Sequence, residues 1–294
     1  MPRRRAVLAL IARLPLGLFH ALGVLLGWFV WLASPRYRRM VAGNLATAGF
    51  ADPAVRRAAI SHAGRGLLEL LPVWFRDPAR AAALVVPDGL EESVLPLIAR
   101  ARAAGRGVIF VTPHLGCFEI TAQWYAHRVG PMTVLFAPPK KGGLDALVRG
   151  GRAKARLKMA TPDLRGMRAL HRALRAGEAV GMLPDQVPGR GEGEWAPFFG
   201  RPAYTMTLVQ RLAEATGASV LLAWGERLPG AAGFRIHVVP MPERESGESA
   251  ARHTNRALES LVRQCPAQYL WGYNRYKVPA GAPAPDPVTG QGGT

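Results

Sequence analysis

Short apolar runs alternate with amphipathic segments through most of the chain, and the two patterns predict different elements. Apolar runs that end at proline, glycine or a polar residue predict buried strands, whereas apolar positions three and four apart predict helices. The predicted strands are residues 83–87, 107–112, 132–138, 179–184, 219–225 and 234–240. The predicted helices are residues 54–75, 91–104, 142–158, 164–176 and 205–216, with one more after residue 119.

The signals at the helix ends support this division. Asp52 followed by Pro53 is typical of a helix start, and Gly105, Gly177 and Gly217 each follow a predicted helix. Alternating strands and helices predict an α/β fold with a mainly parallel central sheet flanked by helices. Ligands of such folds bind at the carboxyl ends of the strands, so residues that directly follow strands are the first candidates for a site.

An apolar stretch at residues 14–34 has no charged side chain, and His20 is its one strongly polar residue. Its length is about what a helix needs to cross a bilayer. It ends in bulky aromatic residues rather than at a small-residue cleavage site, which indicates an uncleaved membrane anchor. We therefore divide the chain into an N-terminal membrane anchor at 1–39, a globular domain at 40–278 and a disordered tail at 279–294, rich in proline and glycine.

Basic residues flank this anchor on both sides, so the positive-inside rule gives no orientation. The same symmetry suits a helix that lies in the interface of an anionic leaflet, and a buried core helix is a further alternative. The flanking residues are Arg3, Arg4, Arg5 and Arg13 on one side and Arg36, Arg38 and Arg39 on the other.

The segment "PHLGCFE" directly follows the predicted strand at 107–112 and contains a candidate catalytic pair. Five residues turn an α-helix by about 140°, so His114 and Glu119 meet only if His114 precedes the helix and Gly116 permits a sharp turn. A carboxylate on one imidazole nitrogen fixes the tautomer and leaves the other nitrogen as a base. We expect His114 to remove a proton from an acceptor hydroxyl, oriented by Glu119.

Two other interpretations of this segment remain open. A histidine at a strand end is often a structural hydrogen-bonding residue rather than a base. Cys117 is a possible nucleophile, although a free cysteine is more often small apolar packing.

Positive charge is strong and locally concentrated. The formal net charge is +18, and only five of the 38 basic residues are lysine. Base composition alone can enrich arginine, but eleven Lys/Arg against two Asp between residues 140 and 175 is a local excess. Arginine binds phosphate in a bidentate manner, so this excess predicts a phosphorylated partner or an anionic lipid.

Several side chains near the later strands are candidate binding residues. Arg149, Arg152 and Arg156 share a face of the predicted helix at 142–158, where they form either a solvated face or a phosphate site. Asp185 and Gln186 directly follow the predicted strand at 179–184, although Asp185 alone could be a turn residue. We interpret the aromatic segment at 195–205 as an exposed loop that either packs as a lid or contacts an acyl chain or the membrane.

Some function classes are excluded by missing patterns. The two cysteines, Cys117 and Cys265, form neither a zinc pattern nor a disulfide framework, so we expect no metal and a reducing, cytoplasmic setting. Phosphate-binding glycine loops are absent, so no nucleotide cofactor is expected. Nucleic acid is a poor fit because no recognition motif accompanies the charge.

From about residue 36 to residue 277 the chain resembles the lipid A biosynthesis acyltransferases, which add secondary acyl chains to the Kdo-bearing lipid A precursor. The blocks that carry the resemblance are "YRRMVAGNLATAGF", "GRGVIFVTPHLGCFEI", the long segment at 150–205, "LAEATGASV" and "PAQYLWGYNRYK". It implies a fold similar to that of the glycerolipid acyltransferases. The family's histidine and glutamate match His114 and Glu119, its essential arginine matches Arg152, and its aspartate after a strand matches Asp185.

The resemblance implies acyl transfer from acyl carrier protein, or from acyl-CoA as alternative donor, to a hydroxyl of a phosphorylated glycolipid. The enzyme would work at the cytoplasmic side of the cell inner membrane, with acyl carrier protein, membrane and acceptor as partners and no cofactor. "HLGCFE" and the "QVPG" after Asp185 depart from commoner members, which leaves acceptor and chain length open. The alternatives are acylation of another lipid, such as a lysophospholipid, ornithine lipid or glycosylated phosphoinositol, and a catalytically silent protein that binds anionic membranes.

Overall fold

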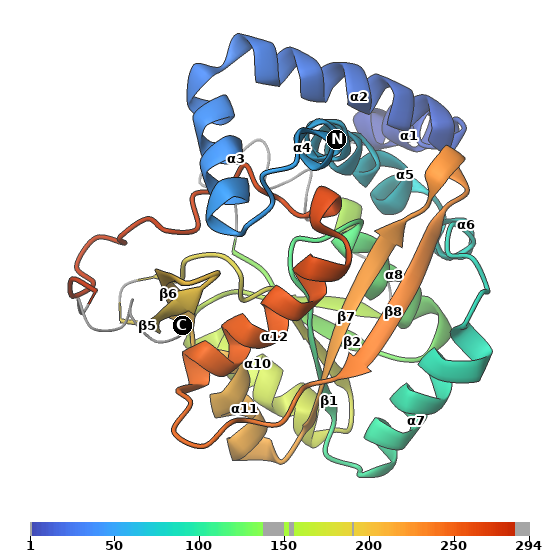
Figure 1. Cartoon of the computed structure of the whole chain (residues 1–294). Coiled ribbons are helices and arrows are strands. Elements are labelled where there is room, and N and C mark those ends of the chain that lie inside the picture. The colour runs from blue at the N-terminus through green and yellow to red at the C-terminus, as the bar shows by residue number, and fades with distance from the viewer. Residues whose placement is uncertain (1, 138–149, 153–155, 190, 286–294) are drawn as a thin grey trace.

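The computed structural model describes residues 2–137, 150–152, 156–189 and 191–285. A six-stranded sheet forms its centre, in the order β3-β2-β4-β1-β7-β8. All neighbouring strands are parallel except β8, which runs antiparallel to β7. The predicted α/β class with a mainly parallel sheet flanked by helices is confirmed (Figure 1). The strands are β1 (Val108–Val111), β2 (Met132–Leu135), β3 (Leu157–Ala160), β4 (Ala179–Met182), β7 (Ser219–Arg227) and β8 (Phe234–Pro240).

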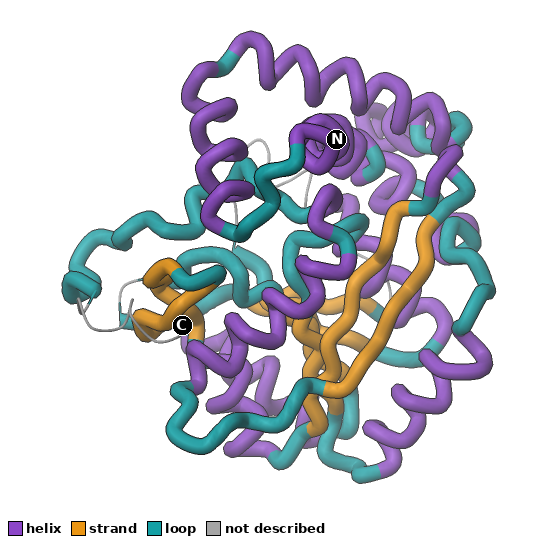
Figure 2. Tube along the Cα trace, in the orientation of Figure 1, coloured by secondary structure: helices purple, strands orange, loops and turns teal. Residues whose placement is uncertain are grey.

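Helices cover both faces of the sheet, because successive strand side chains point to opposite sides. Ile109 and Val111 of β1 lie in one core with helices α10, α11 and α12, whereas Val108 and Phe110 lie in a second core with α7 and α8. The alternation of helix and strand is visible in Figure 2. These helices are α7 (Leu95–Ala103), α8 (Phe118–Arg128), α10 (Leu164–Arg175), α11 (Leu208–Thr216) and α12 (Ala250–Gln264), and a π-helical turn, Leu90–Val94, precedes α7.

The N-terminal helices lie over one end of the sheet, where the parallel strands finish (Figure 1). The side chain of Asp52 accepts a hydrogen bond from the Ala54 N–H at 2.7 Å, which confirms the predicted start of α4. The predicted helix at 54–75 is divided in two at Glu69. The helices of this region are α1 (Pro2–Ile11), α2 (Leu16–Ala33), α3 (Pro35–Thr47), α4 (Pro53–Leu68), α5 (Leu70–Phe75) and α6 (Pro78–Ala82).

Three element predictions are wrong. Residues 83–87 make only an isolated bridge, Val85 to Phe234, instead of a strand. Residues 157–160 form edge strand β3 rather than the end of a helix. The aromatic segment interpreted as a loop contributes to a hairpin of β5 (Gly193–Phe198) and β6 (Arg201–Met206), which delays the start of α11 to Leu208.

Candidate active site

Two loops meet at the carboxyl edge of the sheet because β1 and β4 are adjacent parallel strands. The loop after β1 carries His114, and the loop after β4 carries Asp185 and Gln186. Pro113 follows the strand, and Gly116 has a φ of 59°, which allows the sharp turn expected there. A Cβ at Gly116 would collide with the carbonyl oxygen of Gly225, so the turn also depends on close approach to β7.

His114 is held by Asp185. Its Nδ1 lies 2.8 Å from Oδ1 of Asp185, and its backbone N–H donates to Oδ2 at 2.8 Å. On its other side, Nε2 of Gln186 lies 3.1 Å from Nε2 of His114. An amide nitrogen only donates, so His114 Nε2 is an acceptor and Nδ1 carries the proton. The imidazole is therefore held in the tautomer of a general base.

Asp185 is buried and anionic. Burial alone would raise its pKa, but the electrostatic attraction of the His114 ring and the hydrogen bonds from its ring and backbone, with the charge of Arg275, hold that pKa below its ordinary value. A carboxylate that stays ionised can steady an imidazolium when His114 takes up a proton.

The structure corrects the predicted partner of His114. Glu119 lies in the first turn of α8, but its Oε2 accepts a hydrogen bond from the Trp74 indole at 2.8 Å and another from Nε of Arg152 at 3.0 Å. A second guanidinium nitrogen of Arg152 donates to Oε1 of Glu119. Glu119 therefore points toward Trp74 of α5. The residue that contacts the His114 ring is Phe118, which packs edge-on against it with ring centroids 4.7 Å apart.

Arg152 and Arg156, the two candidate arginines that the structure describes, do not share one site. Arg152 reaches Glu119, with its guanidinium carbon 4.9 Å from the centre of the Phe136 ring. Arg156 lies at the opposite edge of the sheet, just before β3, where it donates to the carbonyls of His127 and Val129 at 3.5 and 3.4 Å. Arg149 lies outside the described residues. Of the two described arginines, Arg152 is the one that contacts the segment after β1.

The C-terminal segment contributes residues that the sequence did not single out. Burial raises the pKa of the Tyr269 phenol well above its ordinary value, and the negative charge of Asp185 raises that pKa further. The Leu270 N–H donates to the His114 carbonyl at 3.0 Å, and the Gly116 N–H donates to the Gln268 carbonyl at 3.0 Å. Residues 268–270 therefore fix the catalytic loop. The block "PAQYLWGYNRYK" was the available signal, but spacing alone assigns it no role.

Cys117 fits packing rather than nucleophilic chemistry. Its side chain is buried in the core between α8 and the sheet. Burial raises the pKa of its thiol well above the ordinary value. Since the thiolate is the reactive form, this environment disfavours attack by Cys117.

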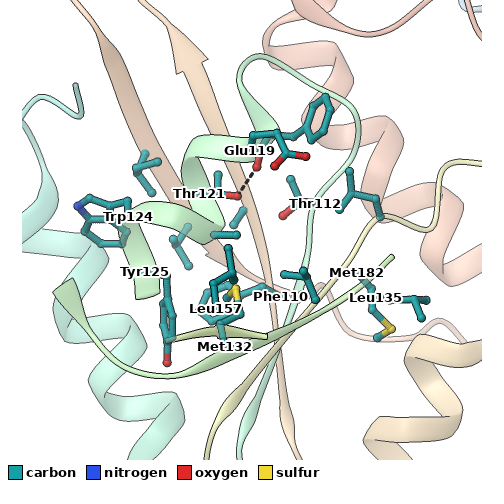
Figure 3. Close-up of a pocket in the computed structure, with 18 of the residues that line it drawn as sticks. Phe110, Thr112, Glu119, Thr121, Trp124, Tyr125, Met132, Leu135, Leu157 and Met182 are labelled. Atoms are coloured by element: carbon teal, nitrogen blue, oxygen red, sulfur yellow. Dashed lines mark hydrogen bonds between the residues drawn. The ribbon is translucent and has the colours of Figure 1, made fainter. Parts of the chain in front are cut away.

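An apolar pocket opens beside His114, between the sheet and helices α7 and α8. Its polar lining comprises Thr112, Thr121 and the Arg152–Glu119 pair, and Phe118, which contacts His114, also lines it. Figure 3 shows Glu119 and Thr121 toward one end of the pocket and Tyr125, Met132 and Leu157 toward the other. The apolar wall residues include Ile98, Phe110, Trp124, Tyr125, Met132, Val134, Leu157, Ile236 and Val238.

The lining of this pocket depends on a missing side chain. Gly181 of β4 pairs with Phe110 of β1 and Val134 of β2, and all three line the pocket. A Cβ at Gly181 would lie 3.1 Å from Cγ1 of Val134 and 3.5 Å from the sulfur of Met132. The missing side chain therefore leaves space in the pocket next to Val134 and Met132.

Metal ligands are not gathered at this site. Within the described ranges, no three His, Cys, Asp or Glu side chains form a group that could hold a metal ion. The arrangement at the carboxyl edge combines an oriented imidazole, a buried carboxylate and an apolar pocket with a cationic residue near its polar end. These are the parts needed to activate a hydroxyl beside a bound hydrocarbon chain.

Comparison with known proteins agrees with this chemistry. The family model for bacterial lipid A biosynthesis acyltransferases matches residues 4–278. The chain is 26% identical over 288 residues to a lipid A biosynthesis lauroyltransferase of Escherichia coli (strain K12), covering 95% of this chain and 92% of that protein. It is 28% identical over 217 residues to a lipid A biosynthesis palmitoleoyltransferase of the same strain, covering 73% of this chain and 68% of that protein. The chain therefore belongs to the bacterial lipid A biosynthesis acyltransferase family.

Proposed function

We propose that this acyltransferase moves a fatty acyl chain from acyl carrier protein to a hydroxyl of a phosphorylated lipid A precursor, at the cytoplasmic face of the inner membrane. Family membership supports acyl transfer in lipid A biosynthesis. The observation that carries the rest is the contact between His114 and Phe118, which joins an oriented base to the apolar pocket.

The reaction needs one base and two substrates. Nε2 of His114 takes the proton of the acceptor hydroxyl, and the hydroxyl oxygen attacks the carbonyl carbon of the thioester. When the tetrahedral intermediate collapses, the carbon–sulfur bond breaks and the leaving thiolate takes the proton from Nε2. Asp185 stabilises the imidazolium between these steps. The proton balance closes without a cofactor, so we propose none.

The Gln186 amide donates a hydrogen bond to the lone pair of His114 Nε2. The substrate hydroxyl must donate to the same lone pair, so we propose that it displaces the amide on binding. Until then the hydrogen bond from Gln186 keeps Nε2 unprotonated and aimed toward the site.

We assign the acyl chain of the donor to the apolar pocket, whose walls are mainly hydrocarbon side chains. Burying a CH₂ group contributes about 0.8 kcal/mol, so the pocket discriminates between chains of different length. We assign Arg152 to substrate binding near the thioester, where its positive charge steadies the developing oxyanion. Glu119 and the rings of Trp74 and Phe136 hold the Arg152 guanidinium in place.

An acidic protein donor is supported by the charge of α10. Arg165, Arg168, Arg172 and Arg175 are exposed at positions that share one helical face. In the part of the chain that the structure describes, none of these four forms a salt bridge. α10 begins at the carboxyl ends of the parallel strands and lies far from α2 (Figure 1). A soluble acidic partner can therefore reach it beside the membrane.

An in vitro assay tests the proposal. Purified protein is incubated with acyl carrier proteins of several chain lengths and the Kdo-bearing precursor, and products are identified by mass spectrometry. We expect acylated precursor from the native protein and none from His114→Ala. Transfer to a lysophospholipid but not to the precursor would reject the acceptor, and turnover of acyl-CoA alone would reject the donor.

A further inference from the structure

The N-terminal apolar helix α2 lies along the globular domain instead of standing free. Gly23 and Gly27 of α2 contact Gly64 of α4. A Cβ on Gly64 would collide with the Gly23 carbonyl oxygen and the Gly27 nitrogen. A Cβ on Gly27 would collide with the carbonyl oxygen of Ile60. The two helix backbones are therefore in direct contact, at the closeness that small residues permit.

A buried polar cluster fastens α2 to the sheet. His20, only 6% exposed, bonds from Nε2 to Oε2 of Glu69 at 3.1 Å. Glu69 in turn forms a salt bridge at 2.5 Å with Arg227 at the end of β7. Removing α2 would leave buried charged groups without one of their partners, which is costly.

The two ends of α2 are also tied to the domain. Arg76 donates to the carbonyls of Ala12 and Leu14 at 2.7 and 2.8 Å, which fixes the turn between α1 and α2. Near the other end, the Trp28 indole donates to the hydroxyl of Ser61 at 3.3 Å.

A helix held in this way cannot cross the bilayer in its observed place. A spanning helix needs apolar surroundings through about 30 Å of hydrocarbon. Along α2 the neighbouring helix is α4, whose Arg56 and Arg57 are exposed to solvent. Carrying α4 into the hydrocarbon would bury those charges without partners.

The outer face of α2 is apolar and exposed. Leu18, Leu22, Leu25, Phe29 and Leu32 form one stripe along the helix, and each is between 42% and 68% exposed. Exposed apolar residues of α1 and the following turn, Val7, Leu10 and Leu14, add to this face. Exposed basic residues at its ends are Arg5, Arg13, Arg36 and Arg39.

We propose that α1 and α2 lie in the plane of one anionic leaflet, with this stripe among the acyl chains and the arginines at the headgroups, and that α2 does not span the membrane. Helices with an apolar face and a basic rim bind membrane surfaces in this manner. The basic rim disfavours a second copy of the chain as the occupant, because like charges would meet. The inference deepens the proposed inner-membrane location and rests on it.

Sidedness labelling tests the proposal. Single cysteines are placed by Arg5→Cys on α1 and Glu214→Cys on α11, in a Cys265→Ala background where the remaining Cys117 is buried. A membrane-impermeant maleimide is applied to intact spheroplasts and to inverted inner-membrane vesicles. We expect both positions to react in inverted vesicles alone. Labelling of position 5 from one side and position 214 from the other overturns the proposal. If both react from the outside, the helix is still on one surface, but the proposed cytoplasmic location fails.

A binding assay tests the lipid contact itself. Leu25→Gln with Phe29→Gln removes the centre of the stripe, and Leu164→Gln is the matched control because Leu164 is 79% exposed on α10. We expect the double variant to lose at least tenfold in flotation with phosphatidylcholine/phosphatidylglycerol vesicles, whereas the control binds normally. Unchanged binding of the double variant, or self-association in place of vesicle binding, contradicts the proposal.

Discussion

Asp185 accepts a hydrogen bond from Nδ1 of His114 at 2.8 Å, although the two residues are 71 positions apart in the chain. The same carboxylate accepts the backbone N–H of His114, and its charge raises the pKa of the Tyr269 phenol. The residue that orients the base therefore follows β4, and the glutamate five residues after the histidine has a different partner.

Asp185→Asn is expected to lower kcat strongly, by about 10³- to 10⁴-fold, because an amide can hold the wrong imidazole tautomer and cannot stabilise the imidazolium. The measurement is steady-state acyl transfer, with circular dichroism to verify folding. Loss of activity without loss of structure supports the pairing, whereas kcat within threefold of the native value contradicts it.

Glu119→Gln is expected to act differently, through Arg152. The variant keeps a hydrogen-bonding group for Trp74 but loses the charge that fixes the guanidinium. We expect a smaller loss of kcat than for Asp185→Asn in the same steady-state assay, since His114 keeps its carboxylate. A loss of kcat as large as that of Asp185→Asn would reinstate the pairing that the sequence suggested.

The comparison of the site with its prediction shows where sequence reasoning stops. Strand ends were visible in the sequence, so His114, Asp185 and Gln186 were all candidates. The order of strands was not visible, and the sheet places β1 beside β4 rather than beside β2. That adjacency is what brings Asp185 to His114, and spacing within "PHLGCFE" carries no information about it.

The wrong element assignments have a similar cause. The strand β3 is at the sheet edge, and its Lys158 is exposed, as is common for edge strands. Because its polar positions merged with the preceding basic segment, a helical pattern seemed to continue through it. Central strands such as β1, with four buried residues, were predicted correctly because burial on both faces leaves a continuous apolar run.

Gly181→Ala is expected to shift the acyl preference toward shorter chains. The new methyl group would stand 3.1 Å from Val134 and narrow the pocket, while the backbone at this position needs no positive φ. Competition among acyl carrier proteins loaded with different chains measures the shift. Gly43→Ala is the matched control, because a Cβ there meets nothing within 4 Å. An unchanged preference would place the acyl chain elsewhere.

His62 is expected to make stability depend on pH between about 6.5 and 4.5. Burial, with the charge of Arg227, lowers the pKa of His62 from 6.5 to about 3. Below pH 6.5 His62 binds a proton in the unfolded chain but not in the folded chain. The free energy of unfolding therefore decreases as the pH is lowered, by at most about 1.4 kcal/mol per pH unit. Burial alone would raise the pKa of Glu69, but its interactions with Arg227 and His20 lower that pKa from 4.5 to about 2. Its contribution to the free energy of unfolding is therefore lost only at lower pH.

Urea unfolding at several pH values checks this expectation. His62→Gln keeps an acceptor for Arg227 but does not titrate, so its stability is expected to change less between pH 6.5 and 4.5 than that of the native protein. His171→Gln, on α10, controls for the loss of an imidazole. Identical pH dependence in the native protein and the His62 variant contradicts the assignment.

Arg168→Glu with Arg172→Glu is expected to raise the KM for acyl carrier protein about tenfold or more and leave kcat nearly unchanged. These exposed residues belong to the arginine face of α10, which we propose contacts the donor protein before acyl transfer begins. Opposite charges across an interface chiefly speed association, and the effect weakens as salt rises. The KM of the native enzyme should therefore rise with ionic strength, and that of the variant should rise less. Arg100→Glu on α7, exposed on the other side of the sheet, is the control for a changed surface charge. A variant whose KM matches that of the native enzyme at low salt would mean that the carrier protein docks away from α10.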